Sequence, residues 1–255
     1  MRKITLLVIS IILFYSSSYS WASLFIDDIY TTDKGRWYID FSADYYRNVE
    51  KSFDDESAEV IKAASRELET AAYISYGLTD KWDAGMTLPY EFENSRDAKV
   101  NGFSDIVIES KYRFLDEKGF WPGFALYFDV KPPTANKEKG LSSGKTDYTI
   151  NTIFTKNVGK YVFDLNLGYF FVAGADDVLF YSFDIGRELT EKLSVCAEIY
   201  AENTFKGNFD DNIFIGALSF DYQINEFISL EVGAGGGISK SSPDYQLSST
   251  LAFTF

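Results

Sequence analysis

The last eleven residues of the chain constrain its fold more than any other stretch. They read YQLSSTLAFTF, so that Leu251, Phe253 and Phe255 fall on one face of an extended chain and small or hydroxylated residues fall on the other. This two-residue period predicts a strand with one apolar face. A soluble protein rarely ends on an unprotected apolar strand, because an exposed edge invites aggregation. A barrel of the bacterial outer-membrane type removes that edge by pairing its last strand with its first.

The N-terminus has the pattern of an export signal. Met1-Arg2-Lys3 is followed by a mostly apolar stretch of eleven residues, 4–14, and by a polar segment that ends at Ala22. Eleven residues are too few for a helix to cross roughly 30 Å of hydrocarbon. The pattern therefore predicts a secretory signal peptide that is cleaved after Ala22. The single cysteine, Cys196, lies far from that position, which argues against a lipid anchor.

The composition excludes several classes of partner. Asp and Glu number 38 against 24 Lys and Arg, and losing Arg2 and Lys3 with the signal peptide would take the net charge from −14 to −16. With no basic patch and no histidine, nucleic acid is excluded as a partner. One cysteine cannot form an internal disulfide. The chain has 18 Tyr and 23 Phe but a mean hydropathy of only −0.13, as expected when half of each strand faces lipid and half faces water.

Alternating segments recur through the rest of the chain, and each is about as long as a tilted membrane-crossing strand. They lie near 35–47, 66–77, 82–92, 104–115, 122–131, 146–157, 160–171, 177–188, 192–203, 211–223, 227–238 and 245–255. The twelve segments predict an all-β fold, a transmembrane antiparallel up-and-down β-barrel of 12 strands with periplasmic N- and C-termini. The predicted organisation is a signal peptide at 1–22, a periplasmic N-terminal segment at 23–34 and one barrel domain at 35–255. Whether residues 23–34 plug the lumen or trail in the periplasm stays open.

The connections between these segments alternate in length. Every second one is short, such as Leu78–Lys81 and Val158-Gly159, whereas three of the others are the long polar stretches 48–65, 93–103 and 132–145. This alternation is typical of an outer-membrane barrel, which has short turns in the periplasm and longer loops outside the cell. Aromatic residues also gather at the strand ends, including three tryptophans on the short-turn side, as two interfacial belts would require. The alternative is a soluble β-sandwich with ordinary core aromatics.

Strand alternation also predicts which charged residues line the lumen, because charge on the lipid face is costly. The candidate lumen-lining residues are Asp40, Asp44, Glu67, Glu69, Asp83, Glu91, Glu109, Lys111, Arg113, Asp129, Lys131, Asp164, Asp184, Glu198, Asp221 and Glu231. One interpretation is a negative lumen that favours cations or neutral polar and aromatic solutes over anions. The other is a largely filled barrel in which these acids hydrogen-bond across the interior. The few basic residues would then face acids and narrow the bore.

Enzymatic interpretations find little support in the sequence. Outer-membrane phospholipases and omptin-type proteases use histidine as a general base, and this chain has none. Carboxylates are so frequent that close pairs are expected without a catalytic role. No spaced ligand loop for calcium is present, and the glycines of 233–237 lie in a predicted strand with no helix after them. We therefore predict no enzyme activity and no catalytic, cofactor-binding or metal-binding residues.

Three stretches together resemble a known family. They are Tyr76-Gly-Leu-Thr-Asp-Lys-Trp-Asp-Ala-Gly-Met-Thr-Leu-Pro-Tyr90, Gly102-Phe-Ser-Asp-Ile-Val-Ile-Glu-Ser-Lys-Tyr-Arg-Phe114 and Lys131-Pro-Pro-Thr-Ala-Asn-Lys-Glu-Lys-Gly-Leu-Ser-Ser-Gly-Lys-Thr-Asp147. In this order they resemble the family of outer-membrane transporters named for the MetA pathway of phenol degradation. The resemblance implies movement of aromatic or other hydrophobic compounds across the outer membrane. Where the family usually has Pro-Thr-Gly, this chain has Pro133-Thr134-Ala135.

Two hypotheses about function follow. The first is a passive channel for small solutes with an acidic lumen, in which the loop 132–145, carrying Lys137, Lys139 and Lys145, is either a lid or a solvated basic surface. The second is a closed structural or adhesive barrel whose outer loops bind surface partners. Either form would have outer-membrane lipids as partners, as well as the barrel-assembly machinery, which reads a terminal residue such as Phe255.

Overall fold

A computed structural model describes residues 24–53, 60–94, 99–204 and 212–255. The predicted signal peptide, 1–22, lies outside the described residues. Apart from one turn of 3₁₀-helix, η1 (Lys137–Lys139), the regular structure in this part of the chain consists of strands. None of the described helical residues forms a helix long and apolar enough to cross a membrane.

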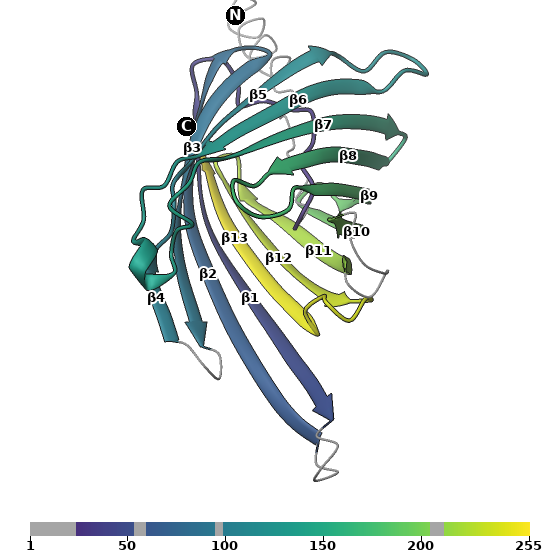
Figure 1. The fold of residues 1–255 in the computed structure, drawn as a ribbon. Coiled ribbons are helices and arrows are strands. Elements are labelled where there is room, and N and C mark those ends of the chain that lie inside the picture. The colour runs from purple at the N-terminus through teal and green to yellow at the C-terminus, as the bar shows by residue number, and fades with distance from the viewer. Residues whose placement is uncertain (1–23, 54–59, 95–98, 205–211) are drawn as a thin grey trace, which may run out of the picture.

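The strands form a single antiparallel sheet (Figure 1). They are β1 (Trp37–Phe53), β2 (Val60–Thr79), β3 (Trp82–Asn94), β4 (Lys99–Phe103), β5 (Val107–Leu115), β6 (Gly123–Lys131), β7 (Asp147–Val158), β8 (Tyr161–Phe171), β9 (Val178–Thr190), β10 (Leu193–Asn203), β11 (Ile213–Asn225), β12 (Ile228–Gly237) and β13 (Tyr245–Thr254). Each pairs with its sequence neighbours, except that β4 and β5 both pair with β3, at different levels.

The sheet closes into a barrel of twelve strands, because β4 and β5 together fill one position of the ring. Closure comes from β1 and β13, which pair from Tyr38 opposite Thr254 to Arg47 opposite Tyr245. The backbones of Trp37 and Phe255 also bond to each other in both directions, at 3.1 and 2.9 Å. The predicted strand count and the predicted pairing of the last strand with the first are both confirmed.

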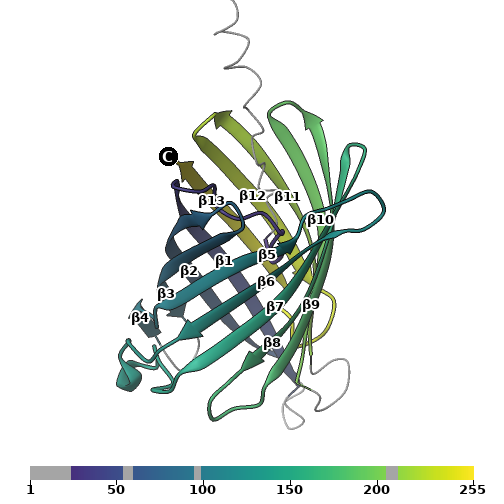
Figure 2. The ribbon, with the colours of Figure 1, turned by 90° about the horizontal axis from the view of Figure 1, so that it is seen from above.

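The two ends of the barrel differ in the length of their connections (Figure 2). At the end where β1 begins and the chain terminates, neighbouring strands are joined by turns as short as Asp80-Lys81 and Gly159-Lys160. We call this the short-turn end and the other the long-loop end. At the long-loop end β1 and β2 project beyond the other strands (Figure 1).

The strands reach farther into two stretches than the sequence indicated. The stretch 48–65 was predicted to be a loop, but β1 and β2 remain paired as far as Phe53 opposite Val60. Within 93–103, β4 pairs with the end of β3. Polar composition led to the loop prediction, and a paired ribbon that projects past the rest of the barrel has no need of an apolar face.

Side chains alternate between the two faces of the wall as the sequence predicts. In β8, Leu165 and Leu167 are exposed on the outside, whereas Asp164 and Asn166 are buried inside. Aromatic side chains at both ends of the barrel are exposed on the outer face, among them Trp82 at the short-turn end and Phe171 at the long-loop end. The outer surface is therefore apolar and the interior polar, which is the inverse of a soluble domain.

Candidate functional site in the barrel lumen

Residues 24–34, which we call the N-terminal segment, lie inside the barrel and cross it from one wall to the other. The amides of Leu24 and Phe25 donate to the two carboxylate oxygens of Glu198 on β10, at 2.9 and 3.2 Å. At its other end the segment reaches β2, where Gly35 donates to the carbonyl of Gly77 at 2.8 Å. The sequence left the place of these residues open, and the structure puts them in the lumen.

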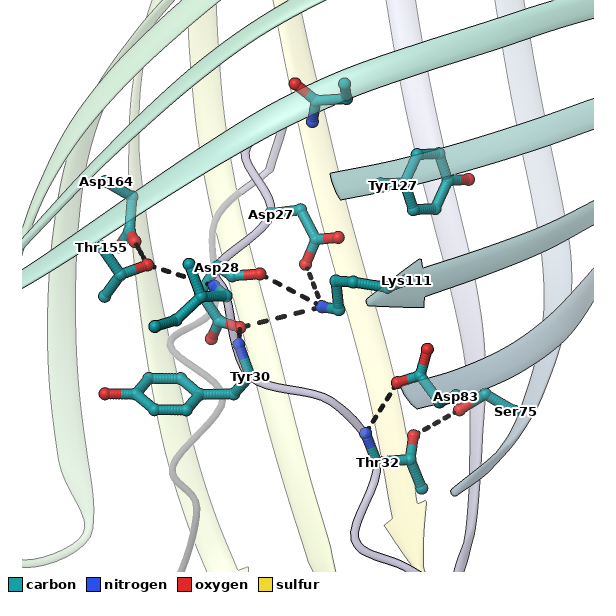
Figure 3. A network of polar contacts seen from close by, with 12 residues as sticks. Asp27, Asp28, Tyr30, Thr32, Ser75, Asp83, Lys111, Tyr127, Thr155 and Asp164 are labelled. Atoms are coloured by element: carbon teal, nitrogen blue, oxygen red, sulfur yellow. Dashed lines mark hydrogen bonds and ion pairs between the residues drawn. The ribbon is translucent and has the colours of Figure 1, made fainter. Parts of the chain in front are cut away.

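The middle of the N-terminal segment is held by one lysine. Lys111 on β5 donates from Nζ to the Asp27 carboxylate at 2.8 Å and to the Asp28 carbonyl at 3.2 Å (Figure 3). The Asp28 carboxylate lies 3.9 Å from the same nitrogen and accepts from the Tyr30 amide at 2.7 Å. Burial raises the pKa of Asp28 to about 8, although Lys111 opposes the shift.

An apolar contact anchors the segment beside this ion pair. Ile29 is 1% exposed and forms a small core with Ala125 on β6 and Ile153 on β7. Its amide donates to the hydroxyl of Thr155 at 3.1 Å, and that hydroxyl donates in turn to Asp164. Gly123 gives Ile29 its room, since a Cβ there would lie 2.1 Å from the Ile29 Cδ1.

The segment leaves the lumen along β3 and β2. The amide of Thr32 donates to Asp83 at 2.7 Å, and the hydroxyls of Thr32 and Ser75 lie 2.6 Å apart (Figure 3). Asp83 and Ser75 are 5% and 1% exposed, so these contacts are shielded from water. Buried, satisfied hydrogen bonds of this kind fix one position of the segment.

A cavity of about 570 Å³ remains beside the N-terminal segment, lined by the segment and by inward side chains of the surrounding strands. One wall is a run of stacked rings, Phe25, Tyr200, Phe180 and Phe170, with successive centroids 5.0, 6.3 and 4.5 Å apart. We call this the aromatic ladder. Gly168 makes space for it, because a Cβ at that position would lie 2.0 Å from Cζ of Phe180.

The facing wall of the cavity combines tyrosines with a carboxylate. Tyr38, Tyr73 and Tyr127 line it, and the Tyr127 hydroxyl donates to Glu109 at 2.8 Å. The other oxygen of Glu109 accepts from Thr87 at 2.6 Å. We call Tyr38, Tyr73, Tyr127 and Glu109 the tyrosine–carboxylate wall. Its residues lie on β1, β2, β5 and β6, whereas the strand residues of the ladder lie on β8, β9 and β10, and both sets line the same cavity.

The structure brings some of the candidate lumen-lining residues together and separates others. Five line the cavity: Asp40, Asp83, Glu109, Lys111 and Asp129. Asp164, Asp184 and Glu198 are 2, 2 and 4% exposed in the interior. Toward the long-loop end, Asp44 accepts from Ser248, and Glu69 lies opposite Glu91 with Glu67 two residues along β2. Asp221 and Glu231 lie opposite each other on β11 and β12.

Most of these acids face other acids, not bases. Across neighbouring strands Glu109 lies opposite Asp129, and Asp184 lies between Asp164 and Glu198. Among the candidates, only Asp83 lies opposite a base, Lys111. The other two basic candidates bond elsewhere: Lys131 to Asp147 at 3.1 Å, and Arg113 to Asp116 at the short-turn end at 3.0 Å. A ladder of opposite charges therefore does not extend around the described part of the lumen.

The loop 132–145 packs on the barrel wall beside β4 and contributes no residue to the cavity lining (Figure 1). Asp105 accepts from the amides of Thr134 and Ala135 at 2.7 and 2.8 Å. Leu141 is buried against Gly102. Lys137, Lys139 and Lys145 are exposed. The contacts that join the second and third family-like stretches thus lie outside the cavity lining, although Glu109 and Lys111 of the second stretch belong to it.

The sequence reasoning missed the aromatic lining and the role of the N-terminal segment. Tyr200 and Tyr127 have the same strand parity as Glu198 and Asp129, so alternation alone would have placed them inside. The segment gives no such signal, because it has no regular period. Among the described residues no group of three or more His, Cys, Asp or Glu side chains is arranged to hold a metal ion.

The sequence profile of the family described as "Putative MetA-pathway of phenol degradation" matches residues 27–255, which include the whole barrel. The chain belongs to this family. The match begins within the N-terminal segment, at Asp27, so the ion-paired part of the segment belongs to the family region too. No protein with curated annotation matches the chain.

Solved structures of the same fold include outer-membrane channels, porins and the translocator domain of an autotransporter. The COG4313 outer membrane channel from Pseudomonas putida F1 aligns with a TM-score of 0.69 and 11% identity, covering 89% of this chain and 98% of that one. The NanC porin gives 0.52 and 13%, covering 85% and 98%. The KdgM porin, solved in complex with disordered oligogalacturonate, gives 0.53 and 10%, covering 86% and 98%. At these identities the likeness establishes the fold, a closed outer-membrane-type barrel.

Proposed function

We propose that this protein is a passive channel of the bacterial outer membrane for small solutes, with a lumen that favours cations over anions. The observation that carries the proposal is the cavity of about 570 Å³, which lies in the lumen beside the N-terminal segment. A barrel used only as a structural anchor has no need of such a space. The family name and the channel fold of its structural relatives support transport over catalysis.

Charge is the basis for the proposed cation preference. Six carboxylates and one ammonium line the cavity as described: Asp27, Asp33, Asp40, Asp83, Glu109 and Asp129 against Lys111. Lys111 is already committed to Asp27 and Asp28. Rings of acidic side chains in a pore concentrate cations and repel anions.

A second function, a closed structural or adhesive barrel, is favoured by the N-terminal segment, because a segment that crosses the lumen and is anchored at both ends obstructs the bore. If the barrel is a channel, the segment only narrows the bore, and solutes pass beside it through the cavity.

Conductance separates the two functions. The folded, full-length exported protein is inserted in planar bilayers, and its reversal potential is measured in a KCl gradient. We expect single-channel steps with a preference for K⁺, and Asp129→Asn should reduce that preference. Glu191→Gln, which neutralises an exposed acid in a turn, is the matched control and should leave it unchanged.

Two results would contradict parts of the proposal. If the protein gives no steps and liposomes that contain it leak no small solutes, the closed-barrel function stands. A conducting pore that prefers Cl⁻ would refute the acidic filter while keeping the channel.

The orientation in the membrane is also proposed. Cleavage after Ala22 would leave the N-terminal segment inside the barrel, with the short-turn end in the periplasm. Phe255, which is 61% exposed at that end, would then be accessible to the assembly machinery from the periplasm. The outer face of the barrel would contact the membrane lipids through its exposed apolar side chains.

A further inference from the structure

The two walls of the lumen cavity present different chemistry to a solute. The aromatic ladder offers ring faces and edges from Phe25, Phe170, Phe180 and Tyr200. The tyrosine–carboxylate wall offers three more rings and the Glu109 carboxylate. A cavity of about 570 Å³ falls within the range of pockets for small ligands, roughly 300–1,000 Å³. A small molecule held in this cavity is therefore offered both aromatic rings and a carboxylate.

Glu109 is held in a fixed position by neutral donors. Thr87 and Tyr127 each donate to one of its oxygens, and no ion pair to it is formed within the described residues. Hydroxyl donors orient the carboxylate without cancelling its charge. Lys111, two residues along the same strand, is directed at Asp27 instead, at 2.8 Å. The negative charge on this wall therefore attracts a cation from the solute.

The rings strengthen the preference for a cation. A cation over an aromatic face is attracted by the ring quadrupole, and the attraction grows where water is excluded. Tyr38 and Tyr73 lie edge to face with centroids 5.9 Å apart, so the face of one ring and the edge of the other are presented side by side. The ladder opposite offers stacking for a planar ring.

We propose that the cavity is a binding site for small aromatic amines in their protonated form, with the ring against the aromatic ladder and the ammonium at Glu109. This inference names the class of solute for the channel proposed above. Transport of the amine rests on that proposed function, whereas binding of the amine does not. Neutral phenols of the same size would gain the stacking contact alone. Aromatic carboxylates would be repelled by the acids that surround the cavity.

Calorimetry on the folded, full-length exported protein in detergent micelles tests binding without requiring conduction. The probe is 2-phenylethylammonium, with 2-phenylethanol, 3-phenylpropanoate and 2-cyclohexylethylammonium as its neutral, anionic and non-aromatic counterparts. We expect the probe to bind at least about 10-fold more tightly than each counterpart, with the anion weakest.

Two substitutions assign the contacts to the two walls. Glu109→Gln removes the charge and keeps one acceptor oxygen for Thr87 or Tyr127, while the hydroxyl that faces the new amide nitrogen can rotate and accept from it. It should weaken binding of the ammonium probe about 10-fold with no effect on 2-phenylethanol. Phe180→Leu should weaken the aromatic amine about 3- to 10-fold and leave 2-cyclohexylethylammonium nearly unchanged. Glu191→Gln is the control for charge removal at a distance, and circular dichroism confirms that each variant is folded.

Equal binding of the amine and the alcohol, or a Glu109→Gln variant that binds the amine as the parent does, would overturn the inference. These results are independent of whether the barrel conducts. A channel that conducts but shows no preference for the amine refutes this site alone, whereas a barrel that binds the amine without conducting refutes the proposed transport alone.

Discussion

Ile29→Ala tests whether the N-terminal segment is held in the lumen by its own contacts. Ile29 is 1% exposed, and its neighbours Ala125 and Ile153 lie opposite each other on the paired strands β6 and β7. Truncation of a buried Ile to Ala costs about 2–5 kcal/mol, including the cavity it leaves. A loss of about 3 kcal/mol shifts the ratio of docked to undocked segment roughly 100-fold.

Hydrogen exchange measures that ratio directly. The amides of Ile29 and Thr32 bond to Thr155 and Asp83 only while the segment is docked, so both should exchange about 100-fold faster in the variant. Strand amides of β1 and β13 should be unaffected. Ile185→Ala is the matched control, because Ile185 is 39% exposed on the outer face. Unchanged exchange at Ile29 and Thr32, or equal acceleration in the strands, would refute a locally held segment.

Gly123→Ala places a Cβ 2.1 Å from Ile29 Cδ1 and should also undock the segment. The free energy of docking lost in the double variant Gly123→Ala/Ile29→Ala should be smaller than the sum of the two single losses, and additive losses measured by exchange would exclude the contact. Asp28 faces Lys111, Asp27 and Asp164, and burial raises its pKa from 3.8 to about 8, so docking of the segment should be strongest below pH 4 and weaken as the pH rises to 8. This pH dependence of docking, measured by exchange of the Ile29 and Thr32 amides, should be lost in Asp28→Asn. If the variant keeps it, another group titrates. Asp116→Asn should change the free energy of unfolding in urea by less than about 1 kcal/mol, because the Asp116 side chain is 59% exposed, although the hydrogen bond from Lys81 lowers the pKa of Asp116. A larger loss would mean that the Lys81–Asp116 pair is shielded from water.

The barrel itself was predictable because its rules are local. Alternation in each strand and the apolar terminal strand determine the count of twelve and the pairing of β1 with β13. The extension of β1 and β2 to Phe53 and Val60 was missed because Lys51 and Lys62 interrupt the apolar alternation of these stretches in the sequence. The connection at 93–103 was misread because β4 continues the wall only by pairing with β3.

The interior was less predictable because it depends on contacts between distant strands. Alternation directs Glu198, Thr155 and Asp83 inward, but their common partner, the N-terminal segment, is shown only by the folded chain. The aromatic ladder lies between these cases. Its strand residues share the parity of acids that were assigned inward, yet their stacking depends on Gly168, whose missing side chain admits the Phe180 ring.

The position of the N-terminal segment has a consequence for the order of assembly. The seam between β1 and β13 joins residues as distant as Tyr38 and Thr254, so its chain entropy cost is the greatest in the sheet. The segment is covalently continuous with β1 and already contacts β5, β7 and β10 on other parts of the wall. We expect these contacts to form before the seam, so that the segment tethers the first strand across the open sheet and shortens the search for β13. We expect deletion of residues 24–33 to slow refolding into micelles while leaving formation of the hairpins unchanged, and an unaltered refolding rate would show that the seam finds its partner unaided.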